Sequence, residues 1–386
     1  MSPAASSATR SSMPLAPASK ASAAARSAVT PAGALTRTSS KGARIPVRSS
    51  RRRLAPLVAL AALLQPGCYL GHLAAGQTRV LLARQPIEEL LAAPETPSDL
   101  AERLRVAGAV RRFASELGLD VGQQYTSYVD WPGDRVVTSV VATRPGEVEA
   151  RGFWFPLVGR VPYKGFFEPS LAQAEAERLA ARGLDTCLFP VLAYSTLGWM
   201  ADPLTAPLAR SPRLAETLIH ELVHATLFVA SQPDFNEGLA TFVGQEGAVR
   251  FAAEREGPEG EERERTRVSE DRLVAAELQA FRDEVQRLYA KAPAGAARDT
   301  DRRALEAHAR ERLAALPLRT RDPRAIAAAA RLNDACQALT GTYQADLPRY
   351  AEVFGALGGN FARLLALARE AAEAPDPRAR LFGALP

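Results

Sequence analysis

The chain has 386 residues, of which 47% are hydrophobic and 24% are charged. This composition excludes an intrinsically disordered protein, and the length allows one large domain or two modest ones. The net charge of +5 is unevenly placed, because ten of the 48 basic residues and none of the 43 acidic residues lie within residues 1–67. The remainder is slightly acidic, so we expect no nucleic-acid partner.

The basic N-terminal segment has the organisation of a leader with a signal peptide. Three arginines, residues 51–53, precede an apolar run, Leu54 to Leu64, that is too short to span a bilayer as a helix. We expect residues 1–67 to be removed and the protein to be exported, facing the periplasm or cell envelope of a bacterium. Cleavage by an ordinary signal peptidase and retention as an uncleaved anchor are the alternatives.

Cys68 directly follows Gly67 at the end of this segment. The pair resembles the lipobox of bacterial lipoproteins, in which the cysteine becomes the acylated first residue, although Gln65 stands where that motif usually has Leu. The resemblance implies a lipid on Cys68 that anchors the protein to the membrane.

The mature chain begins with helical patterns and continues with strands. Apolar residues at spacings of three and four predict helices within residues 76–119. β-Branched and aromatic runs bounded by Gly and Pro predict strands and hairpins within 135–168. Residues 169–185 are then expected to form a helix capped by Gly183, and residues 186–199 a strand followed by a loop.

From about residue 212 the pattern is almost entirely helical. The charged stretch 254–316 is typical of a solvated helical hairpin rather than of a binding surface. We therefore expect an α+β fold in which a mixed part, residues 68–210, and a mainly helical part, residues 211–386, form one catalytic unit.

Two cysteines remain after Cys68. Cys187 and Cys336 are far apart in sequence and belong to no CxxC pair or zinc-binding spacing. We expect two buried thiols, with a disulfide as the alternative for an exported protein.

The motif HELVH, residues 220–224, provides the strongest functional signal. Ser211 and Pro212 predict the start of a helix that continues until Pro233. On it, His220 and His224 lie one turn apart on one face, so both imidazoles can reach one ion. This HExxH arrangement suits Zn²⁺, and Glu221 beside it can accept a proton from a water at the metal.

A catalytic zinc site needs a third protein ligand, and Glu237 is the best placed. Asn236 is expected to cap a second helix, with Glu237 in its first turn folded back over the histidines. Glu246 and Glu216 are weaker candidates, and Glu216 is expected to be a solvated helix residue. His308 lies in a charged helix, where we expect it to be exposed.

The HELVH and FNEGLATF segments resemble the gluzincin metallopeptidases, in which two His and a downstream Glu bind zinc. Together with the segments FPLVGRVPYKGFF, AYSTLGW and LNDACQALTGTYQ, they resemble a bacterial putative aminopeptidase family whose members are commonly exported or lipid-anchored. The resemblance covers most of residues 68–370 and implies a zincin-like helical core. Thr241 departs from the wider gluzincin pattern, which often has Asp there to orient a histidine.

The resemblance and the motif together predict a zinc-dependent peptide hydrolase, with a peptide substrate and a single zinc ion. Glu221 would act as general base, and Tyr194 or Tyr343 would donate a hydrogen bond to the developing oxyanion. Spacing alone identifies no carboxylate that recognises a free amino terminus. The alternatives are a zinc hydrolase acting on a non-peptide envelope amide and a non-catalytic envelope lipoprotein that retains the motif.

Overall fold

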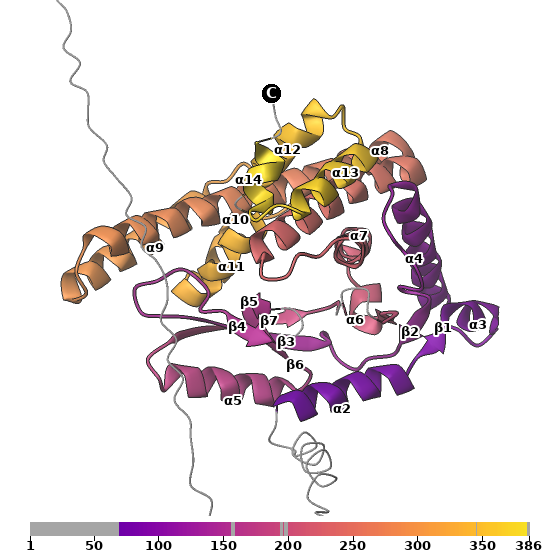
Figure 1. Ribbon diagram of the computed structural model, residues 1–386, viewed down its shortest axis with the longest axis horizontal. Coiled ribbons are helices and arrows are strands. Elements are labelled where there is room, and N and C mark those ends of the chain that lie inside the picture. Colours follow the sequence, from indigo (N-terminus) through magenta and orange to yellow (C-terminus); the bar gives the residue numbers. More distant parts are fainter. Residues whose placement is uncertain (1–68, 156–158, 194–195, 197–199, 345, 384–386) are drawn as a thin grey trace, which may run out of the picture. The chain divides into compact units, whose positions relative to one another are not determined.

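The computed structural model describes residues 69–383 except 156–158, 194–195, 197–199 and 345 (Figure 1). Cys68 and the predicted leader lie outside the described residues. The N-terminal half alternates helices and short strands, whereas the C-terminal half is helical. The elements of the N-terminal half are α2 (Tyr69–Leu82), β1 (Gln85–Pro86), α3 (Ile87–Ala92), α4 (Ser98–Glu116), β2 (Ser127–Val129), β3 (Val137–Thr143), β4 (Phe153–Phe155), β5 (Gly159–Val161), β6 (Tyr163–Phe166), α5 (Pro169–Ala180), β7 (Asp185–Val191), β8 (Leu204–Thr205) and α6 (Ala206–Ala209).

The C-terminal half carries the helix of the HELVH motif and the long helix that follows it. Its elements are α7 (Leu214–Thr226), α8 (Pro233–Lys291), α9 (Ala296–Ala314), α10 (Pro323–Ala329), α11 (Asp334–Gln344), α12 (Leu347–Ala356), α13 (Phe361–Ala372) and α14 (Pro377–Phe382). This mixture of helices and small sheets confirms the predicted α+β class. Within the described part of the chain, no helix combines the length and apolar character needed to cross a membrane.

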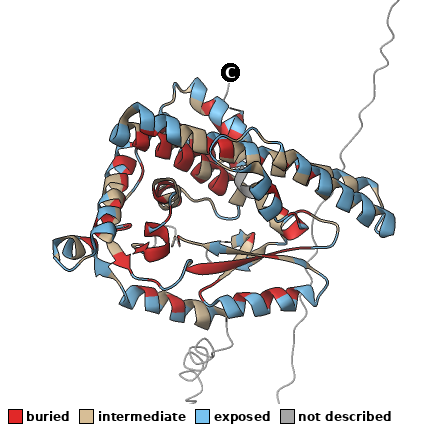
Figure 2. Ribbon diagram, turned by 180° about the vertical axis from the view of Figure 1, so that it is seen from behind, coloured by how far each residue is buried: buried red, intermediate tan, exposed pale blue. Residues whose placement is uncertain are grey.

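β3 is the central strand of an antiparallel sheet with the order β6-β3-β7. All of its residues are buried, as the red strand in Figure 2 shows. Helix α5 covers one face through Ala172, Ala176 and Leu179, and α11 lies against the other face (Figure 1). Because both faces are covered, the small polar residues Thr138, Ser139 and Thr143 of this strand are buried together with its valines and Ala142.

A second small sheet connects the N-terminal helices to the segment that precedes α7. β2 pairs antiparallel with β1 and parallel with β8, so that Tyr128 lies opposite Leu204. This pairing brings the loop before β2 and the loop before β8 together, although about 75 residues separate them in sequence.

The largest hydrophobic core surrounds α7. Leu218, Leu222 and Val223 of α7 are buried in it together with Phe235 and Phe242 of α8. Apolar residues of α4 and α13 complete this core. The helix with the HELVH motif is therefore held on several sides by packed side chains, which gives its polar face a fixed orientation.

The charged stretch 254–316 forms the second part of α8 and all of α9. Gly257 has a φ of 71° and interrupts the regular helical backbone of α8. Ion pairs such as Arg312 with Glu277 and Glu284 connect the two helices, whose outer faces are exposed. The expected solvated hairpin is confirmed, and His308 is exposed as predicted.

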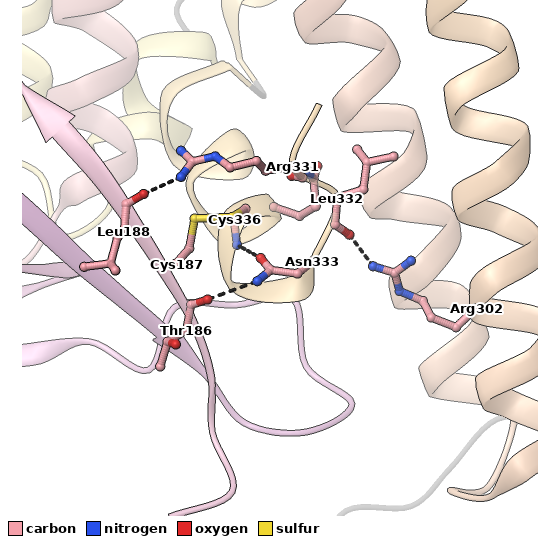
Figure 3. The surroundings of a disulfide bond; sticks show 9 residues. Thr186, Cys187, Leu188, Arg302, Arg331, Leu332, Asn333 and Cys336 are labelled. Atoms are coloured by element: carbon pink, nitrogen blue, oxygen red, sulfur yellow. Dashed lines mark hydrogen bonds between the residues drawn. A yellow bond between two sulfur atoms is a disulfide. The ribbon is translucent and has the colours of Figure 1, made fainter. Parts of the chain in front are cut away.

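Cys187 and Cys336 form a disulfide, so the expectation of two free thiols was wrong. The bond joins β7 to α11. The Cα atoms of the two cysteines are 5.1 Å apart, although 149 positions separate them in sequence. Around it, Asn333 accepts a hydrogen bond from the Cys336 amide and donates one to the Thr186 carbonyl (Figure 3). Sequence position says nothing about spatial proximity, which is why the pairing was missed.

Candidate metal centre

Helix α7 presents His220 and His224, but its ends differ from those predicted. The helix starts at Leu214 and has no side-chain cap. The Ser211 hydroxyl accepts a hydrogen bond from the amide of Arg213, which precedes the helix, and not from an amide of its first turn. It ends at Thr226, well before Pro233. The two histidines still lie one turn apart on one face, since both fall within the regular part of the helix.

A short loop reverses the chain between α7 and α8. The expected cap at Asn236 was wrong, because α8 already begins at Pro233 and Asn236 lies inside its first turn. The Asn236 side chain instead accepts a hydrogen bond from the Val229 amide and donates one to the Val229 carbonyl, which fixes the loop. Glu237 consequently starts the second turn of α8 rather than the first.

Close packing of α8 on α7 brings Glu237 to the histidines. Gly244 of α8 lies so close to α7 that an added Cβ would be 2.9 Å from the Glu216 carbonyl oxygen and 3.3 Å from the His220 Cβ. One turn further along, a Cβ on Gly247 would meet Ile219 at 3.0 Å. Because glycine has no side chain, Gly244 and Gly247 allow α8 to pack this close to α7.

Three ligand atoms converge between the helices. The Nε2 atoms of His220 and His224 are 3.1 Å apart, and Oε2 of Glu237 lies 3.3 Å from the first and 3.4 Å from the second. An ion bound tetrahedrally at about 2.0–2.1 Å separates its ligand atoms by roughly 3.3–3.4 Å. The triangle thus has the dimensions that one metal ion requires, and these residues can hold a metal ion.

The site is buried and its charges are balanced for binding a cation. Burial alone would raise the pKa of Glu237, but the charge of His224 and hydrogen bonds from both histidines lower it to about 2. Burial would lower the pKa of His224, and the negative charge of Glu237 raises it instead. Glu237 is therefore ionised at neutral pH and offers the negative charge that a metal ligand needs.

Glu221 follows His220 and projects from an adjacent face of α7, where two buried polar residues lie close to it. The pKa of Tyr125 is raised well above its usual value by burial, then by the charges of Glu221 and Asp202. The pKa of Asp202 is raised to about 6, mainly by burial and further by Glu221. Sequence reasoning missed both residues, because they come from loops far from the motif and follow no recognisable spacing.

A cavity of about 210 Å³ lies beside this part of α7. Ala225, one turn after Glu221, forms part of its wall. The remaining wall comes from the two loops that the β1-β2-β8 sheet brings together, namely Asp120, Gly122, Gln123 and Gln124 before β2 and Met200 and Ala201 before β8. The cavity can admit a small group to the Glu221 side of the helix.

The other predicted residues fall into two groups. Tyr194 lies outside the described residues, as does the side chain of Tyr343, whose backbone belongs to α11. Glu246 is not part of the metal group and pairs with Arg265 and Arg272.

Glu216 was expected to be solvated, which was wrong. Its side chain is only 12% exposed and is paired with Arg267 at 2.6 Å. Nδ1 of His224 has no hydrogen-bond partner among the described residues, so none of them orients this ring through its second nitrogen.

Two His and one Glu on successive helices, with a second Glu beside the first His, define a candidate metal-dependent enzyme centre. A family model described as "Putative aminopeptidase" matches residues 68–381, and the chain belongs to this family. The match spans both the strand-containing part and the helical part, in agreement with the resemblance of the individual segments. No curated protein and no solved structure matches the chain.

Proposed function

We propose that the protein is a zinc-dependent peptide hydrolase that acts as an aminopeptidase. The observation that carries this proposal is the triangle of His220, His224 and Glu237 ligand atoms, with Glu221 following His220 on the same helix. Two imidazole nitrogens and one carboxylate oxygen are a donor set typical of catalytic zinc, which keeps a fourth position for water or substrate. Membership of the family supports a peptide substrate.

Zinc fits the site better than a hard cation does. Mg²⁺ and Ca²⁺ prefer six or more oxygen ligands, whereas this group offers two nitrogens and a single carboxylate in a tight, buried triangle. When bound, zinc would supply Lewis acidity, which lowers the pKa of a water and polarises the substrate carbonyl.

The protein's own residues then have separate tasks. His220, His224 and Glu237 hold the ion, and the ionised Glu237 offsets part of its charge. Glu221 accepts the proton of the attacking water as the new carbon–oxygen bond forms. It then passes this proton to the amine, which leaves when the carbon–nitrogen bond of the resulting tetrahedral carbon breaks. An intact carboxylate at this position favours a catalytic site over one that only binds metal.

Replacing the base and replacing the ligands should have different effects. Glu221→Gln keeps the shape of the side chain but cannot accept a proton, so zinc should remain bound while turnover falls by about two to four orders of magnitude. His220→Ala and His224→Ala remove ligand atoms, so both zinc and turnover should be lost. Metal analysis alongside peptide cleavage measures both quantities, and near wild-type turnover of Glu221→Gln with bound zinc would refute the proposed mechanism.

The aminopeptidase assignment requires a separate measurement. Peptides with a free amino terminus should be cleaved from that end, whereas the same peptides with an acetylated terminus should resist cleavage. Mass spectrometry of the products identifies the bond that is cut. Equal cleavage of free and acetylated peptides would refute the aminopeptidase assignment and leave a zinc endopeptidase.

We further propose that the protein is an exported lipoprotein anchored through Cys68. The disulfide between Cys187 and Cys336 supports export, because such bonds persist in oxidising compartments and are rare in the cytosol. Cys68→Ala should release the protein from the membrane fraction or stop its processing. Mass spectrometry of the mature N-terminus provides the decisive measurement, and an unmodified terminus at another residue would rule out the anchor.

A further inference from the structure

We propose that the hydroxyl of Tyr125 is a catalytic hydrogen-bond donor, which binds the oxygen of the substrate carbonyl as that oxygen becomes negatively charged. This inference rests on the proposed hydrolase function and adds a residue that neither the HExxH motif nor the family match identifies. It is carried by four observations: the backbone conformation of Tyr125, the hydrogen bonds that impose it, its position beside α7 and the state of its hydroxyl.

Tyr125 has an unusual backbone conformation. Its φ of 58° lies in the left-handed region, which bulky aromatic residues rarely adopt because their Cβ clashes with the backbone. Such a conformation is unfavourable and persists only where the surrounding structure imposes it. Strain of this kind is concentrated at catalytic and ligand-binding sites, so it calls for a functional explanation.

Hydrogen bonds between two loops impose this conformation. The Tyr125 amide donates to the Asp202 carbonyl at 2.7 Å, and the Asp202 amide donates to Oε1 of Gln124 at 2.6 Å. Nε2 of Gln124 donates to the Met200 carbonyl at 2.8 Å. The loop before β2 is thus fastened to the loop before β8, and Tyr125 is held in a fixed position.

This position lies on the Glu221 side of the metal centre. Gln124, the residue before Tyr125, and Ala225, one turn after Glu221, line the same cavity of about 210 Å³. The charge of Glu221 acts on the Tyr125 hydroxyl and also on His224, so both groups lie within electrostatic reach of one carboxylate. A substrate carbonyl attacked by the water that Glu221 activates would therefore lie between the metal and the loop carrying Tyr125.

The hydroxyl is available to donate. The Tyr125 side chain is only 3% exposed, yet its hydroxyl makes no hydrogen bond to any residue that the structure describes. Burial and the neighbouring carboxylates raise the pKa of Tyr125, so the phenol stays protonated throughout the working pH range. It donates a hydrogen bond without transferring its proton, and that bond strengthens as charge develops on the substrate oxygen.

Tyr125→Phe tests this role, because a functional hydroxyl and a structural one predict different outcomes. A hydroxyl that stabilises the fold would lower the thermal midpoint when removed, whereas an unpartnered buried hydroxyl should leave it unchanged or raise it. For a donor used only in the transition state, kcat should fall by about 10²–10³ with KM and zinc content unchanged. Wild-type kcat in this variant would overturn the proposal.

Tyr128→Phe is the matched control. Tyr128 is also buried and lies three residues further along, but burial and then the charge of Asp130, not that of Glu221, raise the pKa of its hydroxyl. This variant should lose thermal stability and retain kcat. If both variants lose stability and activity together, Tyr125 is a structural residue and the proposal fails.

A binding measurement separates this proposal from the proposed function. A phosphinic dipeptide has a tetrahedral centre with an anionic oxygen, and calorimetry with the zinc-loaded protein measures its affinity without turnover. Absence of peptide cleavage by the wild type would refute the hydrolase function alone. For Tyr125, we expect the variant to bind the phosphinic dipeptide about 10²-fold more weakly than the wild type; equal binding by both proteins, or binding by neither, would overturn its role.

Discussion

Glu237 and Glu246 lie on the same helix but have opposite surroundings. Glu237 contacts the two histidines, whereas Glu246 pairs with Arg265 and Arg272. Glu237→Gln removes the negative charge that faces the metal, so zinc affinity should fall by more than about 100-fold. This loss should exceed the one caused by replacing a residue that only hydrogen-bonds to a ligand. Competition with a zinc-binding dye measures this change.

Glu246→Gln is the control for this prediction. It breaks the charge pairing within the helical part but does not alter the metal group, so the thermal midpoint should fall while zinc affinity is retained. The reverse pattern, with zinc affinity lost in Glu246→Gln and kept in Glu237→Gln, would show that the helix geometry described above is wrong.

Asp202 should give the metal-free protein a measurable pH dependence. Its folded pKa of about 6 lies above the ordinary value of 3.8, so between these values the folded state holds a proton that the unfolded state has released. Stability from this residue is therefore present below about pH 4 and is lost as the pH rises to about 6. Asp202→Asn removes this loss, since the amide is neutral at every pH.

Thermal midpoints of the metal-free wild type and Asp202→Asn at pH 4.5 and pH 7.5 provide the test. The variant should gain stability relative to the wild type as the pH rises. Other acidic groups titrate equally in both proteins and cancel in the comparison. A constant difference between the two proteins across this range would mean that Asp202 is ionised throughout.

At the scale of elements, the contact between α7 and α8 determines the metal geometry. An added Cβ at Gly244 would lie 2.9 Å from the backbone carbonyl of Glu216, which cannot move without moving α7. We expect Gly244→Ala to separate the helices, to lower zinc affinity by at least about tenfold and to lower the thermal midpoint. Both quantities can be measured on one purified protein.

Gly355→Ala is the matched substitution in α12. No atom lies within 4 Å of an added Cβ there, and the residue is exposed. Alanine should therefore stabilise this helix by about 0.5–1 kcal/mol through its better helical propensity. Unchanged zinc affinity in Gly244→Ala would show that the two helices can separate without disturbing the ligands.

At the scale of the whole molecule, the disulfide connects the sheet to the helical part. Replacing Cys187 and Cys336 together with Ala should lower the free energy of unfolding by about 2–5 kcal/mol, because the unfolded chain loses a constraint between distant segments. Zinc should remain bound, since the ligands lie on α7 and α8. Hydrogen bonds from Asn333 and Arg331 to β7 still hold α11 in place.

Denaturant unfolding with and without reductant measures this contribution. Reductant should destabilise the wild type. It should have no effect on the double variant, which lacks the bond and therefore controls for other effects of the reductant. A wild-type protein whose stability is insensitive to reductant, despite complete reduction of the bond, would contradict the prediction.

The sequence by itself determined the metal group and the fold class. His220 and His224 are four residues apart, and helical periodicity alone places such residues on one face. A turn signal before Glu237 was enough to bring the third ligand back, even though the helix starts three residues before the predicted cap at Asn236. Local patterns also identified the strands around β3 and the solvated hairpin of α8 and α9, because these depend on short-range periodicity.

Only the tertiary structure decided which distant segments meet. The disulfide, the hydrogen bond between the Tyr125 and Asp202 loops, and the pairing of Glu216 with Arg267 all join residues that are 51 or more positions apart. Periodicity extends over a few turns of helix or a few residues of strand, so it carries no information about such pairs. They are fixed by the packing of whole elements, in which Gly244 and the core around α7 determine how closely the backbones approach.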